Sequence, residues 1–174
     1  MRLTVNGIER GIESAPLTPL LYVLREELGI TSPKAGCQQG GCGSCTVLVD
    51  GEARRACLLA VAAVDGAEIT TVEGLGAPEA LSTIQTAFHE HYAAQCGFCT
   101  SGMLIAAHAY LEHGGSAERE SIQETLSGHV CRCTGYVKII DAVAAAAGGE
   151  ITSRQKWLPQ TGEESPVEVP GAPA

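Results

Sequence analysis

Eight cysteines divide into two groups of four along this chain of 174 residues, with none left over. Four thiolates are a usual ligand set for structural zinc sites and for iron–sulfur clusters, so the count predicts two metal centres in series. The first group is Cys37, Cys42, Cys45 and Cys57, and the second is Cys96, Cys99, Cys131 and Cys133.

Composition narrows the classes of protein that could hold such centres. The formal net charge is −9 and no run of Lys or Arg is present, which argues against nucleic acid because phosphates are neutralised by a basic patch. The first residues lack the apolar core of a signal peptide, and no stretch of about 18 apolar residues could span a membrane. Cytoplasm is therefore the default location, and in that reducing compartment cysteines are better explained as metal ligands than as disulfides.

The first part of the chain predicts a small mixed sheet crossed by one helix. Asn6-Gly7 suits the type I′ turn of a hairpin, and Thr18-Pro19 predicts a helix start with Thr18 as N-cap, ended by Gly29. Strands are expected over 46–49 and 69–72, with a glycine-rich cysteine loop over 36–45. The apolar stripe of the predicted helix consists of Leu17, Leu20, Leu21, Leu24 and Leu28. This is the outline of a β-grasp.

From Pro78 onward the apolar spacing changes to that of helices, and four short helices are expected to form a small bundle. The predicted fold class is α+β, with a plant-type ferredoxin-like domain over 1–76 and a helical domain over 77–149. An extended or disordered tail over 150–174 follows, in which Trp157-Leu158 could anchor on a partner. The apolar positions of the helices are Leu81, Ile84 and Phe88, then Met103, Leu104, Ala107 and Leu111, then Ile122 and Leu126, then Tyr136, Ile139, Ile140 and Val143.

The spacing of the first cysteine group is that of plant-type ferredoxins. Cys37 is followed by Cys42 and Cys45 in one glycine-rich loop, and Cys57 lies outside it. Glycines let the backbone curl around a cluster and direct N–H groups at sulfur. Zinc would favour two compact Cys-x2-4-Cys knuckles. The three-plus-one pattern therefore favours a [2Fe–2S] cluster.

The second group is less specific. Cys96-x2-Cys99 and Cys131-x-Cys133 could hold two irons, and zinc would fit the count nearly as well. A thioredoxin-like redox pair is disfavoured, because no βαβ unit surrounds Cys96 and Cys99 and the other two cysteines would be left without a role. Spacing alone leaves iron and zinc both open.

Longer motifs resemble the iron–sulfur part of the molybdenum hydroxylases, the xanthine dehydrogenase and aldehyde oxidoreductase family. The resemblance extends from about residue 2 to about residue 147, and its motifs lie at 24–29, 36–47, 71–75, 95–103 and 131–136. It implies that both groups bind [2Fe–2S] clusters, the second within a four-helix domain.

The resemblance also implies a role: a small, non-catalytic electron-transfer subunit of a heteromeric oxidoreductase. A large subunit would hold molybdopterin, as the cytosine dinucleotide, and a medium subunit would hold FAD unless the acceptor is external. Gln95 would hydrogen-bond the pterin, Cys133 would lie beside it, and an apolar patch over 95–98 would dock the large subunit. The alternatives are a free-standing two-cluster electron carrier, which the second domain disfavours, and a zinc-bound interaction module.

Two residues depart from the family pattern without removing a ligand. Ser101 stands where the family usually has proline, and His129 where it usually has asparagine. His129 as a Rieske-like ligand is disfavoured, because such centres need two histidines in place of two cysteines. The remaining histidines, His89, His91, His108 and His113, are expected on helix surfaces or at helix caps.

Overall fold

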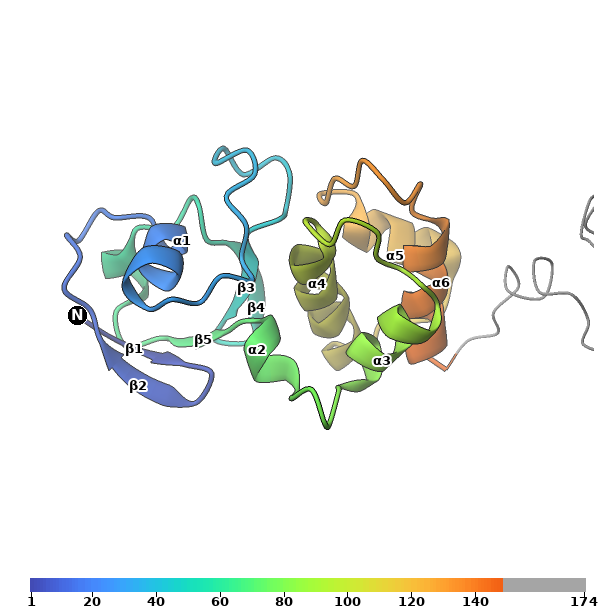
Figure 1. Cartoon of the computed structure of the whole chain (residues 1–174), viewed down its shortest axis with the longest axis horizontal. Helices are drawn as coiled ribbons and strands as arrows, with labels where there is room; N and C mark the ends of the chain where they lie inside the picture. Colours follow the sequence, from blue (N-terminus) through green and yellow to red (C-terminus); the bar gives the residue numbers. More distant parts are fainter. Residues whose placement is uncertain (149–174) are drawn as a thin grey trace, which may run out of the picture.

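The computed structural model describes residues 1–148, in which five short strands form one mixed sheet (Figure 1). The strand order is β2-β1-β5-β3-β4; β1 and β5 are parallel, and the other neighbours are antiparallel. The strands are β1 Arg2–Val5, β2 Ile8–Gly11, β3 Thr46–Val49, β4 Glu52–Arg55 and β5 Glu68–Thr70. This sheet, followed by helices, confirms the predicted α+β fold class.

Both hairpins of the sheet turn on residues with positive φ. Asn6 and Gly7 have φ of 51° and 76°, and Asp50 and Gly51 have φ of 50° and 83°. Positive φ at both central positions is the requirement of a type I′ turn, which matches the twist of paired strands. The predicted Asn-Gly hairpin is confirmed.

The crossing helix begins later than its sequence suggested. α1 covers Leu20–Tyr22 and continues as a π-helical segment, η1, over Val23–Glu27, before Gly29 ends it with φ of 69°. Pro19 is the N-cap with extended ψ, so Thr18 as N-cap was wrong. Leu17 is 83% exposed and does not belong to the stripe.

The reason lies in a neighbouring segment. The Leu20 N–H donates to the Leu59 carbonyl at 2.7 Å, and Pro19 pairs with Ala60 in an isolated bridge. The chain before Leu20 is therefore held extended beside the segment that leads into the short 3-10 helix η2, Val61–Val64.

The last strand also differs from its prediction: it ends at Thr70, two residues before its predicted end, and α2 occupies Val72–Leu75.

Helices make up the second part of the described chain (Figure 1). α4 is central, because it is buried on nearly every side and packs between strand β3 and the other helices. On the sheet side Ile105 and Ala109 contact Leu48. Leu81 is 45% exposed and precedes the first of the bundle helices, which starts after a Ser82–Gln85 capping box. The helices are α3 Thr83–Glu90, α4 Thr100–Glu112, α5 Arg119–Leu126 and α6 Val137–Ala146.

The sheet and the helices meet without an intervening gap at the start of α4. A Cβ at Gly102 would collide with the Gly43 carbonyl, so glycine is needed for this approach. Beside it the Ser101 hydroxyl donates to the Ser32 carbonyl at 2.6 Å. The serine that departs from the family pattern therefore links α4 to the segment ahead of the first cysteine loop.

No helix within residues 1–148 is long and apolar enough to cross a membrane. The predicted tail over 150–174, with Trp157-Leu158, lies outside the described residues. The division of the chain between residues 76 and 77 remains a proposal; it falls between α2 and α3.

Candidate metal centres

The first cysteine group gathers at one end of the β3–β4 hairpin. Cys45 immediately precedes β3, and Cys57 follows β4 by two residues. Because Thr46 pairs with Arg55 across these antiparallel strands, both cysteines are delivered to the same end of the sheet. The loop before β3 supplies Cys37 and Cys42.

Within this group the thiols associate in two pairs. Cys37 and Cys42 exchange N–H···S contacts of 3.4 and 3.3 Å. Cys45 and Cys57 are hydrogen-bonded to each other. Backbone donors, first Gln39 and then Cys42, lower the pKa of Cys37 to about 7, whereas burial raises the pKa of Cys45 to about 11.

The second cysteine group spans the bundle. Cys96 and Cys99 lie in the loop ahead of α4, where Cys99 is the N-cap, and the other two lie between α5 and α6. The Cys133 thiol approaches the Cys96 sulfur at 3.5 Å, and Cys99 is hydrogen-bonded to Cys131. Burial raises the pKa of Cys99 to about 12. Burial also raises the pKa of Cys131, but hydrogen bonds led by Thr134 outweigh it and lower that pKa overall.

The pairing of the sulfurs bears on whether each cysteine group suits a [2Fe–2S] cluster or a single zinc ion. Within the described residues, no three His, Cys, Asp or Glu side chains converge as they would around a single ion. All eight cysteines are free of disulfides. A [2Fe–2S] cluster takes two thiolates on each of two irons, whereas zinc collects four ligands around one centre. Sulfurs in two pairs match the two thiolates that each iron of such a cluster takes, in the second group as well as the first.

Tyr136 braces the second cysteine loop. Its hydroxyl accepts the Cys131 N–H at 2.7 Å and donates to the His129 carbonyl at 3.1 Å. The residue has φ of 67° and is the N-cap of α6. The sequence placed Tyr136 at the end of the 131–136 motif and in the apolar stripe of the helix, but did not predict this bracing role. Its position just after Gly135 in the cysteine motif was the available signal of this second role.

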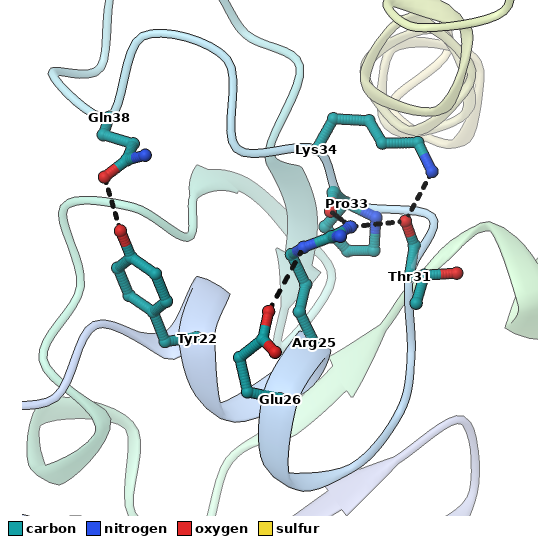
Figure 2. A network of polar contacts seen from close by, with 7 residues as sticks. All are labelled: Tyr22, Arg25, Glu26, Thr31, Pro33, Lys34 and Gln38. Atoms are coloured by element: carbon teal, nitrogen blue, oxygen red, sulfur yellow. Dashed lines mark hydrogen bonds and ion pairs between the residues drawn. The ribbon is translucent and has the colours of Figure 1, made fainter.

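From the crossing helix, Arg25 braces the segment just before the first cysteine loop and Tyr22 braces the loop itself (Figure 2). Arg25 Nη1 donates to the carbonyls of Thr31 and Pro33 at 2.8 and 2.9 Å. The Tyr22 hydroxyl donates to Gln38 Oε1 at 2.5 Å, and Gln38 has φ of 55°. The motif over 24–29 was recognised from the sequence, but the hydrogen bonds of its arginine to backbone carbonyls were not predicted.

The two cysteine loops touch each other. A Cβ at Gly36 would lie 3.4 Å from the Phe98 ring, so this ring covers the residue before Cys37. The Val130 N–H donates to the Cys42 carbonyl at 2.9 Å. The two candidate centres are therefore connected through one hydrogen bond between residues of the two loops.

His129 is buried where the loops meet. It is 5% exposed, and its Nε2 lies 3.0 Å from Thr46 Oγ1 and 3.2 Å from Arg55 Nη1. Burial, and secondarily the Arg55 charge, lower the pKa of His129 to about 4, so the ring is neutral at pH 7. Among the other histidines, His91 and His113 are the C-caps of α3 and α4.

Gln95, Cys96 and Cys133 are exposed together at the surface, whereas Cys99 is buried. The large apolar side chains exposed near the two centres are Leu58, Tyr92, Phe98, Val130 and Val137. Within the stretch 95–98 the Phe98 ring is 47% exposed, and the docking patch expected there stays a prediction.

Two family models together match nearly the whole described chain. Residues 3–71 match a 2Fe-2S iron-sulfur cluster binding domain, and residues 71–144 match a [2Fe-2S] binding domain. These matches bear out an iron–sulfur rather than a zinc reading of both halves.

The chain is also similar over most of its length to small subunits of known oxidoreductases. It is 46% identical over 144 residues to the nicotine 6-hydroxylase small subunit of Paenarthrobacter nicotinovorans, a match that covers 83% of this chain and 87% of that protein. Quinoline 2-oxidoreductase from Pseudomonas putida 86 has a chain with a TM-score of 0.80 and 45% identity, covering 85% of this chain and 94% of that one.

A third relative is much longer. The aldehyde oxidoreductase of Megalodesulfovibrio gigas is 45% identical over 148 residues, and the match covers 83% of this chain but only 16% of that protein. The same fold thus occurs as a small subunit in some relatives and as a small part of a larger chain in another.

Proposed function

The chain belongs to the two-cluster [2Fe–2S] small subunits of the molybdenum hydroxylases, and from this membership we propose that it relays electrons from a molybdopterin site in a large subunit to FAD in a further subunit or to an external acceptor. It is an electron-transfer subunit, and it takes part in the reaction without binding the substrate. The molybdopterin is proposed to be the cytosine dinucleotide.

The eight cysteines are proposed as the iron ligands in the pairs that the contacts define. Each [2Fe–2S] cluster, when bound, supplies a site that accepts and gives up one electron. The protein supplies N–H donors to the sulfurs, such as Gln39 to Cys37 at 3.4 Å, and such donors tune the potential. The proposed pairs are Cys37 with Cys42, Cys45 with Cys57, Cys96 with Cys133, and Cys99 with Cys131.

The observation that carries the relay is the contact between the two cysteine loops. The Val130 N–H···O=C Cys42 bond leaves one hydrogen bond and a few covalent bonds between ligands of the two proposed centres. A carrier with two unrelated clusters would not need its loops to touch.

The surface around Gln95 is proposed as the side that faces the large subunit. Gln95, Cys96 and Cys133 are exposed there, and exposed polar and thiol groups next to an apolar ring are suited to a partner that covers them. Gln95 would then hydrogen-bond the pterin and Cys133 would lie beside it. The exposed loop residues Gln38 and Gln39 lie on the first centre, where electrons would leave.

The test is anaerobic affinity purification of the tagged chain from its source organism, followed by metal analysis. We expect about four irons per chain, together with molybdenum and a co-purifying large subunit. About four irons with neither molybdenum nor a partner would overturn the relay in favour of a free-standing carrier. Zinc in place of iron under strictly anaerobic conditions would overturn the cluster ligands as well.

A further inference from the structure

We propose that Arg55 is a positioning residue that clamps the two cysteine loops together and places one positive charge between the two clusters. The inference rests on the proposed function, because it requires both clusters. Arg55 lies outside the cysteine motifs at 36–47, 95–103 and 131–136.

The guanidinium of Arg55 reaches both loops. Its Nη2 donates to the Gly128 carbonyl at 2.8 Å, three residues before Cys131. Its Nε donates to the Gly40 carbonyl at 3.3 Å, between Cys37 and Cys42 in the sequence. One rigid, planar group therefore ties the two loops to each other from the end of β4.

A third contact fixes the orientation of this fork. Arg55 Nη1 donates to Thr46 Oγ1 at 2.7 Å, and Thr46 in turn donates to the Gly43 carbonyl at 2.6 Å. Thr46 is 1% exposed. Thr46 pairs with Arg55 across β3 and β4, so the sheet register sets the position of the arginine.

Glycine at 128 leaves space for the guanidinium of Arg55, and glycine at 43 leaves space for the neighbouring His129 ring. A Cβ at Gly128 would lie 2.7 Å from Arg55 Nη2, and a Cβ at Gly43 would collide with the His129 ring. Gly128 therefore allows the backbone to lie close to the guanidinium that its carbonyl binds.

The charge of Arg55 has no carboxylate partner among residues 1–148, whose ion pairs involve other side chains. A partly buried cation without a counter-charge is costly. Clusters held by four thiolates are anionic, and both proposed clusters adjoin loops that Arg55 contacts. The clusters are therefore the natural counter-charges, and a nearby cation favours their reduced forms.

Replacing Arg55 by lysine or by glutamine tests the clamp between the loops and the positive charge separately. Lysine keeps the charge, but its single ammonium cannot donate to three acceptors in a fixed fork. Glutamine keeps a donor but removes the charge. The matched control is Arg54, the exposed neighbour on the same strand, whose side chain points to the opposite face.

The experiment is an EPR-monitored anaerobic redox titration of the purified complex carrying wild-type chain, Arg55→Gln, Arg55→Lys or Arg54→Gln. Arg55→Gln is expected to shift the reduction equilibrium of each cluster toward the oxidised form by up to about tenfold, which is about 59 mV for one electron. Arg55→Lys should lie nearer the wild type in potential, yet share the lowered thermal stability of Arg55→Gln. Arg54→Gln should change neither.

Unchanged potentials of both clusters in Arg55→Gln, with iron content equal to wild type, would overturn the proposal. If Arg55→Gln loses iron, the Arg55→Lys variant is measured in its place. An iron-loaded Arg55→Lys protein with wild-type potentials supports the charge role. An Arg55→Lys protein with the thermal stability of the wild type contradicts the clamp. Failure of the proposed function is recognised separately in the wild type, which would then lack molybdenum and a large subunit, or would lack about four irons per chain.

Discussion

The Val130 N–H and the Cys42 carbonyl form a 2.9 Å hydrogen bond that joins the second cysteine loop to the first. Val130 precedes Cys131, so the bond connects neighbours of a proposed ligand in each group. The covering Phe98 ring and the Gly102–Gly43 approach lie at the same boundary. The two cluster-binding units are therefore held as one body where electrons would pass between them.

Replacing a cysteine should remove one centre and spare the other. Cys57→Ser is expected to lower the iron content from about four to about two per chain and to abolish only the first cluster's EPR signal. Cys131→Ser should abolish only the second. Loss of both signals in either variant would contradict independent ligand groups, and retention of full iron would contradict the ligand assignment.

Gly102→Ala should weaken the packing of α4 against the first cysteine loop. The added Cβ would collide with the Gly43 carbonyl, which is backbone and cannot move aside cheaply. We expect a loss of about 1–3 kcal/mol in unfolding free energy, measured by thermal unfolding of the cluster-loaded protein. Gly11→Ala is the matched control, since no atom lies within 4 Å of its added Cβ; an equal loss in both variants would rule out this cause.

Tyr136→Phe should act on the second cluster alone. Removing the hydroxyl leaves the Cys131 N–H and the His129 carbonyl without their partner, at a cost of about 1–3 kcal/mol. The EPR spectrum and potential of the second cluster should change while those of the first stay constant. Tyr110→Phe, which loses a bond to the exposed Ser116 carbonyl, is the control and should alter neither spectrum.

Glu73 should contribute to stability throughout the neutral range. Burial raises its pKa, but hydrogen bonds from Ser32 and Thr71 outweigh burial and hold the pKa below 4.5. A depressed folded-state pKa means that the contribution is complete above the unfolded value and is lost only as pH falls through the lower folded value.

The matching measurement compares the melting temperatures of wild type and Glu73→Gln between pH 8 and pH 5. The variant should melt lower by a nearly constant margin across this range, because the carboxylate stays ionised. A margin that shrinks steadily between pH 7 and pH 5.5 would show that the pKa is raised instead, contrary to the hydrogen bonds of 2.5 Å from Ser32 and Thr71.

Local sequence signals located the elements well where a residue type has one conformational use. Asn6-Gly7 fixed a hairpin because few other residues tolerate its positive φ values, and cysteine spacing located both metal loops. The helix start predicted at Thr18-Pro19 was wrong, because the fixed φ of proline suits an extended N-cap as well as a first helical turn. The extended conformation of Pro19 is stabilised by the hydrogen bond from the Leu20 N–H to the Leu59 carbonyl, which is distant in sequence.

The supports of the site could not be read from local patterns. Arg55 acts through the Gly40 and Gly128 carbonyls, and backbone acceptors have no sequence signature. The pairing of Cys96 with Cys133 likewise depends on how the α5–α6 loop is folded over the start of α4. Such contacts become visible only when tertiary structure brings distant loops together. The domain limits at 76 and 149 and the role of Gln95 remain predictions.

EPR spin quantitation of the dithionite-reduced chain in its purified complex shows whether the chain holds two distinct one-electron clusters. We expect two different [2Fe–2S] signals with about one unpaired electron each per chain. Their lines should broaden or split on cooling, because the two loops are in contact. A single signal of about one electron per chain, or a colourless protein without any signal, would contradict the presence of two clusters.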